Sequence, residues 1–326
     1  MPMMTEKPHV LDVISIGDAN IDLIMSVPHH PNIDLNGDRG AGVRGSWYHL
    51  GPGGVAANVA AGMARLGNRV GFIGVVGDDE MGRNVQQILL NMGIDIRYLR
   101  SVSGYQTTLT SCFESAEGQA VHYACLGPTR ISGACLEPEY LDKSRMLFLC
   151  GNIMTQDEDN GHLLVETMQQ ARRRGAIIAL DPGKFWLNMD LASYVHEAVA
   201  AADIVLPNAY EAELLSGCSQ PREASRSLLD RGVKVVAMKL GEAGCIACTH
   251  DEEIEIPGFK TEVKSHLGAG DSFNSGFLHG YLRCWPLMKM ARFANASASL
   301  KVRYPGTQAG LPTESEVEAF LAEHAS

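Results

Sequence analysis

A run of small residues followed by an acid, Gly268-Ala269-Gly270-Asp271, stands directly before a stretch with helical character. Small residues let the backbone approach a ligand closely. The start of the following helix directs unpaired N–H groups and the positive end of the dipole at that ligand. An anion hole beside a carboxylate that accepts a proton is what phosphoryl transfer to a hydroxyl requires. A simple N-cap role for Asp271 is the alternative, and this segment alone does not decide between them.

Two further segments supply side chains that suit a polyhydroxyl ligand. Asn20 and Asp22 follow the first predicted strand, where open α/β sheets bind ligands, and strand alternation points them the same way. Gly53-Gly54 leads into a predicted helix that carries Asn58, whose amide offers a donor and an acceptor. Carboxylate and amide groups together suit vicinal hydroxyls, whereas a polar turn and an ordinary strand–helix turn are the alternatives.

Asn208 and Glu211 follow another predicted strand and share one face if a helix begins there. Hard oxygen ligands suit Mg²⁺, which takes few protein ligands and keeps its waters; a capped helix start is the alternative. The glycine-containing turn from Lys239 to Gly244 could admit a flat base. The chain has neither the glycine fingerprint of dinucleotide-binding folds nor a P-loop, which argues against an oxidoreductase.

Short apolar runs alternate with helical segments over most of the chain. Strands are predicted at 10–16, 70–76, 146–150, 177–180, 202–206 and 233–238. Helices are predicted at 56–66, 81–92, 162–174, near 211, and at 224–231, 271–283, 287–303 and 314–323. This alternation indicates an α/β fold with a mostly parallel sheet covered by helices on both faces.

Two segments interrupt that alternation. The stretch 31–50 is rich in Gly and Asn and contains Trp47-Tyr48, and 107–125 has two β-prone runs around Glu117-Gly118, as in a hairpin. We interpret them as a small β lid inserted into one domain that spans 1–326. A pair of surface excursions is the alternative. An isolated two-stranded piece is marginal and needs something to pack on.

Composition narrows the class of protein. The 326 residues are 45% apolar, and the formal net charge is −11. An acidic chain with no basic face argues against a nucleic-acid partner. No apolar run is long enough for a membrane span, and the first nine residues lack a signal-peptide core. Eight scattered cysteines, including Cys245 and Cys248 in an apolar run, indicate free thiols and a cytoplasmic location.

The order of these motifs resembles the ribokinase-like (PfkB) carbohydrate kinase family from about Val10 to Phe320. The sequence is similar to the first family signature at Gly53-Gly54, Asn58 and Ala60, and then at Gly67 and Gly77. The second is similar to Gly268-Ala269-Gly270-Asp271 and the four residues from Ser275 to Leu278. The resemblance implies a three-layer α/β/α core with a small β lid, and an ATP- and Mg²⁺-dependent kinase for a ribose-, fructose- or sugar-acid-like substrate.

Carried over position by position, the resemblance also implies a role for each site residue. Asp271 is the catalytic base, and the N–H groups of Gly268, Ala269, Gly270 and Asp271 form the anion hole. The substrate residues are Asn20, Asp22, Gly53, Gly54 and Asn58. Asn208 and Glu211 organise Mg²⁺ through water. Lys239, Gly241, Gly244 and Asn295 lie near the nucleotide, and Lys184 falls where many members have Arg.

One departure concerns a monovalent cation. Family members usually carry Asp-Thr two residues before the small-residue loop, and the Asp helps to bind that cation; here the positions hold Ser265-His266. Cation activation is therefore not expected. The resemblance further implies a homodimer through the lid. A nucleoside kinase and a non-catalytic sugar sensor remain alternatives, although a sensor would need neither Asp271 nor Glu211.

Overall fold

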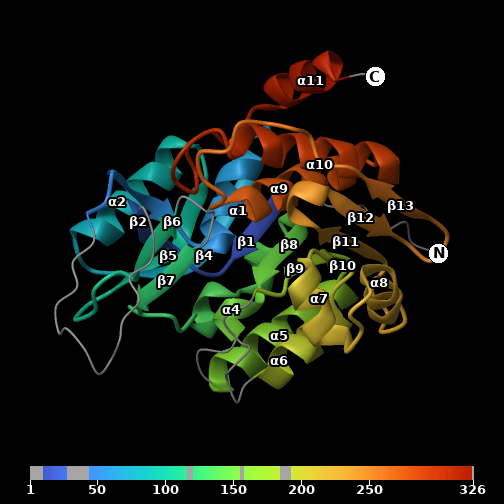
Figure 1. Cartoon of the computed structure of the whole chain (residues 1–326). Coiled ribbons are helices and arrows are strands. Elements are labelled where there is room, and N and C mark those ends of the chain that lie inside the picture. The colour runs from blue at the N-terminus through green and yellow to red at the C-terminus, as the bar shows by residue number, and fades with distance from the viewer. Residues whose placement is uncertain (1–9, 28–43, 116–119, 155–157, 184–191, 325–326) are drawn as a thin grey trace, which may run out of the picture.

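The computed structural model describes residues 10–27, 44–115, 120–154, 158–183 and 192–324. Its core is a nine-stranded sheet (Figure 1). The strands are β1 (Leu11–Ile16), β4 (Val70–Gly77), β5 (Asp95–Val102), β8 (Ser144–Cys150), β9 (Ile177–Asp181), β10 (Ile204–Val205), β11 (Val235–Lys239), β12 (Cys245–Cys248) and β13 (Glu253–Ile256). They lie in the order β13-β12-β11-β10-β9-β8-β1-β4-β5. The seven strands from β11 to β5 run parallel, and β12 and β13 add an antiparallel edge.

Helices cover both faces of this sheet and make three layers (Figure 1). One face carries α1 (Val55–Arg65), α2 (Glu80–Asn91), α9 (Ala269–Leu282) and α10 (Leu287–Lys301). The other carries α5 (Glu158–Arg173), α6 (Ala192–Ala201), α7 (Ala209–Ser216) and α8 (Pro221–Leu229). The remaining helices are α3 (Pro138–Leu141), α4 (Gly151–Met154), α11 (Glu314–Glu323) and the 3₁₀ turns η1 (Gly133–Cys135) and η3 (Gly241–Ala243).

The central strands explain why the sequence reads as unbroken apolar runs. In β1, Ile14 and Ile16 enter the core cluster on one face, while Val13 enters the cluster on the other. Burial on both faces removes the polar–apolar alternation of a half-exposed strand. Within the described part of the chain, no helix is both long and apolar enough to cross a bilayer.

A second sheet, which we call the small sheet, lies beside the core. It contains β2 (Asn20–Val27), β3 (Trp47–Gly53), β6 (Leu109–Ser115) and β7 (Ala120–Cys125), in the order β3-β2-β6-β7. Strands β6 and β7 pair antiparallel where the sequence indicated a hairpin. The predicted lid stretch 31–50 contributes only the beginning of β3, and its residues 31–43, like the Glu117-Gly118 turn, lie outside the described residues.

Strand β2 excludes the alternative that Asn20 and Asp22 belong to a polar turn after the first strand. Its backbone pairs with β3 on one side and with β6 on the other, so these polar residues begin a central strand of the small sheet. Long-range partners satisfy the backbone here, and a local sequence pattern does not reveal them.

One face of the small sheet is apolar and open. Two cross-strand rows place Tyr48, Met25, Phe113 and Val121, and then Leu50, Leu23, Ser111 and Tyr123, on the same side. Tyr48, Leu50 and Tyr123 are 72%, 54% and 58% exposed. Neighbouring residues such as Asp22 and Ile24 point to the other side and are buried.

Candidate active site

Asp271 stands in the first turn of α9, where the sequence predicted an anion hole. Helix α9 begins at Ala269, and its N-cap is Gly268, whose backbone is left-handed with φ 75°. A Cβ at Gly268 would come within 2.4 Å of the Thr307 carbonyl oxygen, so only glycine fits. The first-turn N–H groups have no partner inside the helix, and they point with the helix dipole toward the space in front of Asp271.

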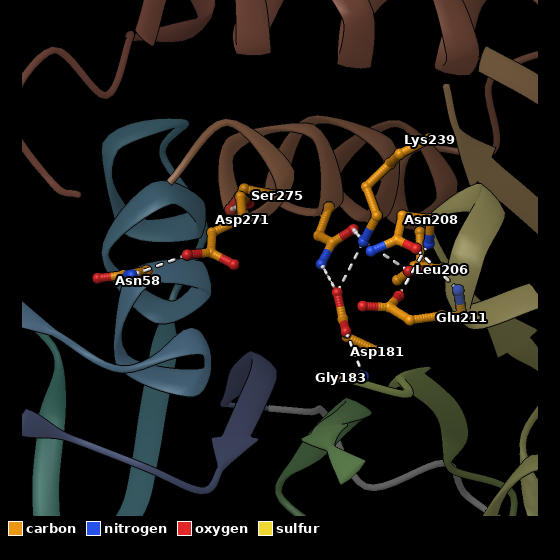
Figure 2. Close-up of polar contacts among 10 residues, drawn as sticks. Asn58, Asp181, Gly183, Leu206, Asn208, Glu211, Lys239, Asp271 and Ser275 are labelled. Atoms are coloured by element: carbon orange, nitrogen blue, oxygen red, sulfur yellow. Dashed lines mark hydrogen bonds and ion pairs between the residues drawn. The ribbon is translucent and has the colours of Figure 1, made fainter. Parts of the chain in front are cut away.

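The Asp271 carboxylate is held by a short chain of amides. Asn58 on α1 donates from Nδ2 to Asp271 Oδ2 at 2.7 Å (Figure 2). Gln308 Nε2 in turn donates to Asn58 Oδ1 at 3.0 Å. Burial raises the pKa of Asp271 to about 7, although the hydrogen bond from Asn58 opposes that rise. A carboxyl group with this pKa is poised to take up a proton near neutral pH. Asn58, predicted to meet the substrate, is thus engaged with Asp271.

A second polar cluster lies near Asp271 and was largely missed by the sequence analysis. Lys239 Nζ contacts Asp181 Oδ2 at 2.7 Å and the Leu206 carbonyl oxygen at 2.6 Å (Figure 2). Asn274 donates to the same Asp181 oxygen at 2.6 Å, and the Gly183 N–H binds the other at 2.9 Å. Burial lowers the pKa of Lys239, but the carboxylates, Asp181 first, outweigh it and raise the pKa overall. Lys239, predicted near the nucleotide, is therefore buried in an ion pair.

Asn20 and Asp22 meet at the start of β2. Asn20 Nδ2 donates to Asp22 Oδ1 at 2.6 Å and reaches Thr110 Oγ1 at 3.3 Å. Burial raises the pKa of Asp22 to about 6, against hydrogen bonds from Thr307 and Asn20. Gly53 on the neighbouring β3 faces this carboxylate so closely that a Cβ would lie 2.1 Å from Asp22 Oδ2. The glycine is needed for this close approach.

Asp18 closes the N-terminus of α1. Its two carboxylate oxygens accept from the N–H groups of Val55 and Ala56, both at 3.0 Å. Gly54 has φ 94°, and a Cβ there would lie 2.5 Å from the Asp18 carbonyl oxygen and 2.7 Å from Asn20 Oδ1. Gly54 therefore lets the chain turn against these residues, and Asp18 is used as a structural cap.

A pocket opens between the core and the small sheet. The polar part of its wall is formed by Asp18, Asn20, Thr108, Thr110, Thr129 and Asn152, and the apolar part includes Val75, Leu126, Pro128 and Ile153. Asn20 is the side chain predicted for substrate binding that lines this pocket; Asp22 and Asp271 lie outside its wall.

Asn208 and Glu211 form a reciprocal capping box at the start of α7. Asn208 Oδ1 accepts from the Glu211 N–H at 2.8 Å, and Glu211 Oε2 accepts from the Asn208 N–H at 2.8 Å (Figure 2). This is the capped helix start that the sequence analysis kept as an alternative. Glu211 is buried, and its charge acts on Lys239.

The other residues predicted near the nucleotide occupy structural positions. Gly244 has φ 102°, and a Cβ there would lie 2.0 Å from the Ile256 carbonyl oxygen. Gly241, with φ 63°, begins η3 and has open space around its α-carbon. Asn295 Nδ2 donates to the carbonyl oxygens of Ile256 and Pro257 at 3.1 and 3.3 Å. Lys184 lies outside the described residues.

The fold and this site together define a sugar kinase of the ribokinase type. The chain belongs to the pfkB family of carbohydrate kinases, whose family model matches residues 10–314. It transfers a phosphoryl group from ATP to a hydroxyl of a sugar or sugar derivative.

Two relatives are similar over nearly their whole length. A 5-dehydro-2-deoxygluconokinase of Geobacillus kaustophilus (strain HTA426) is 27% identical, over 99% of this chain and 97% of that protein. An aminoimidazole riboside kinase of Salmonella typhimurium is 29% identical, over 95% of this chain and 94% of that protein.

Solved structures share the fold. A fructokinase with bound ATP from Xylella fastidiosa superposes with a TM-score of 0.82 at 20% identity, over 97% of this chain and 99% of that one. A candidate ribokinase II from E. coli in complex with ATP and Mg²⁺ gives 0.80 at 23% identity, over 97% and 100%. The predicted α/β/α architecture is thereby confirmed.

Proposed function

We propose that Asp271 is the general base of this kinase and that the N–H groups of the Gly268–Asp271 loop bind the transferred phosphoryl group. The observation that carries the proposal is the half-buried Asp271 carboxylate at the start of α9, held on Oδ2 by Asn58. With Oδ2 engaged, Oδ1 is the oxygen expected to receive the proton. Asn58 then orients the base rather than only touching the sugar.

The proposed step balances as follows. The acceptor hydroxyl oxygen forms a bond to the γ-phosphorus of ATP, and the bond from that phosphorus to the β–γ bridging oxygen breaks. The hydroxyl proton passes to Asp271, and ADP leaves. The N–H groups at the N-terminus of α9 stabilise the negative charge on the equatorial oxygens while the phosphoryl group moves.

The magnesium ion that accompanies ATP would find few protein ligands here. Among the described residues no three His, Cys, Asp or Glu side chains gather as a metal site. That fits Mg²⁺, which is often bound through phosphates and water with one or two carboxylates. We assign the water-mediated contact to Glu211 and Asn208, as the resemblance implies, while their capping bonds fix the oxygens in place. The bound ion would neutralise phosphate charge.

We assign the acceptor to a site that extends from the pocket lined by Asn20 to the neighbouring Asp22, the hydrogen-bond partner of Asn20, with Asp22 as its anchor and Gly53-Gly54 beside it. The described lining of this pocket includes Asp18 and neither lysine nor arginine. With no cationic side chain in that lining to pair with an acceptor carboxylate, uncharged sugars should be used better than sugar acids.

The test is an ADP-release screen over ketoses, aldopentoses, sugar acids, sugar phosphates and nucleosides. The proposal expects sugar-dependent ADP release that is lost in Asp271→Asn. Sugar binding without any ADP release in the wild-type protein would instead support the non-catalytic sensor.

A riboside is the second candidate acceptor. The apolar part of the pocket wall, formed by side chains such as Leu126, Pro128 and Ile153, offers a surface for a flat ring. One relative acts on aminoimidazole riboside by name. Nucleosides outperforming free sugars in the screen would favour this candidate.

We also propose that the chain forms a homodimer through the apolar face of the small sheet. Tyr48, Leu50 and Tyr123 are each more than half exposed and stand on the same face, and a contiguous exposed apolar patch is typical of an interaction site. The acidic composition fits a cytoplasmic enzyme with no nucleic-acid or membrane partner.

A further inference from the structure

A buried lysine stands directly behind the loop that carries Asp271. Lys301 is the last residue of α10, and its side chain is 0% exposed. Its ammonium donates to the carbonyl oxygen of Leu267, the residue before the Gly268–Asp271 loop. Burying an ammonium costs free energy unless nearby negative groups offset it. Packing alone therefore does not explain why the ammonium group of Lys301 lies here.

The groups that face Lys301 come from the core and from the small sheet. Glu114 at the end of β6 is buried and accepts from Ser265 Oγ at 3.1 Å and from the His266 N–H at 3.3 Å. Burial lowers the pKa of Lys301 to about 8, while the carboxylates of Asp271 and Glu114 favour its charged form. His49 on β3 has its pKa lowered, by burial first and then by the charge of Lys301. At neutral pH this cluster holds a lysine cation.

A monovalent metal cation does not fit this place. The resemblance implied such an ion near the loop, bound with help from an aspartate. Here Ser265 supplies a neutral hydroxyl, which is already bonded to Glu114. The Leu267 carbonyl oxygen, a natural cation ligand, already accepts from Lys301. A second cation beside a buried ammonium would be repelled strongly at this depth.

We propose that the Lys301 ammonium serves as a permanent, covalently attached cation behind the anion hole. By holding the Leu267 carbonyl, Lys301 positions the loop whose N–H groups bind the phosphoryl group, and its charge favours negative charge at that point. Lys301 acts through the loop and is therefore a positioning residue. The inference rests on the proposed function of the Gly268–Asp271 loop.

The test compares two substitutions of Lys301. Lys301→Ala removes the charge and leaves space beside the Leu267 carbonyl, whereas Lys301→Met removes the charge but fills the space. Removing a hydrogen-bond donor that directly contacts an oxyanion lowers turnover by about 10²–10³-fold. Lys301 acts one contact further from the phosphoryl group, so its loss should lower turnover by about tenfold or more. Potassium or ammonium should restore Lys301→Ala and leave Lys301→Met unchanged. Lys264→Met, at an exposed position nearby, is the matched control.

MgATP affinity by titration calorimetry and turnover are measured in potassium, sodium and a bulky organic cation at equal ionic strength. For the wild-type protein, the MgATP affinity and the turnover should each agree within about twofold among the three cations, because the positive charge is supplied by Lys301 itself. Strong activation of the wild-type enzyme by potassium would overturn the inference. So would a folded Lys301→Met with wild-type turnover.

If Lys301→Ala fails to fold, Lys301→Met and the wild-type cation series test the inference. One further result separates the inference from the proposed function. A wild-type protein that binds MgATP equally in every cation but phosphorylates no acceptor would contradict the proposed function while supporting the inference.

Discussion

At the scale of single residues, the proposed role of Asp271 rests on its partial burial beside one hydrogen-bond donor, Asn58. Asp271→Asn keeps the size and the contact region of the side chain but cannot accept the proton. Positioned acid–base groups typically supply about 10²–10⁴-fold, so turnover should fall by at least 10²-fold. MgATP binding, measured by calorimetry, should persist. Near-normal turnover in a folded Asp271→Asn protein would remove Asp271 from the chemistry.

The pH dependence gives an independent view of the same carboxyl group. Burial raises the pKa of Asp271 to about 7, and the base form exists only above that pKa. The value of kcat/KM should therefore fall by roughly tenfold per pH unit as the pH drops below 7. The hydrogen bond from Asn58 lowers this pKa, so Asn58→Ala should move the fall to higher pH. Unchanged profiles for Asn58→Ala and wild type would show that another group titrates.

Substitution of Asp22 tests the proposed acceptor site. Hydrogen bonds to a charged group contribute about 1.5–3 kcal/mol net, so Asp22→Ala should weaken sugar use by roughly tenfold to a hundredfold. The affinity for ATP should barely change. Both substrates are titrated after circular dichroism establishes folding. Equal losses for sugar and ATP would indicate that Asp22 is structural.

Local sequence made Asp271 and the loop before it predictable, because small residues and an acid before a helix are adjacent in the chain. Asp181, Lys239 and Asn274 were not predictable as a cluster, since the contacts join residues far apart in sequence. Lys301 reads as an ordinary lysine near a helix end. Only the packing of α10 against the loop reveals that its charge is buried.

At the scale of elements, Asn208 and Glu211 cap the start of α7, and we propose that the same two residues contact magnesium through water. Glu211→Gln keeps an oxygen for the Asn208 N–H but removes the charge. It should raise the magnesium concentration that gives half-maximal rate, with little loss of stability. Asn208→Ala removes the cap and should lower the free energy of unfolding by about 1 kcal/mol. An unchanged magnesium titration for Glu211→Gln would mean that Glu211 is only structural.

The elements of the parallel core were predictable because strands buried on both faces leave apolar runs bounded by glycines. Strand β5 was missed, since Arg97 and Arg100 break its apolar pattern on a partly exposed edge. Strand β2 was missed because its first residues are polar and its partners β3 and β6 are distant in sequence.

At the scale of the whole molecule, the apolar face of the small sheet governs the expected assembly. Tyr48 and Tyr123 stand on this face and are more than half exposed. Light scattering at micromolar concentration should give the mass of a dimer, and Tyr123→Glu should shift it toward the monomer. Lys289→Glu, a charge change on α10 away from the small sheet, is the control. A monomer mass for the wild-type chain would remove the dimer proposal.

Strand β2 has one further consequence, because its two sides serve different partners. Asp22 points toward the proposed acceptor site, while the adjacent Leu23 and Met25 lie on the apolar face. A ligand that fixes one side of a strand can change the free energy of fixing the other side, and thermodynamic linkage makes any such effect reciprocal. If sugar changes the self-association constant by a given factor, self-association must change the affinity for sugar by the same factor. Dilution alone should then alter the apparent sugar affinity of this enzyme.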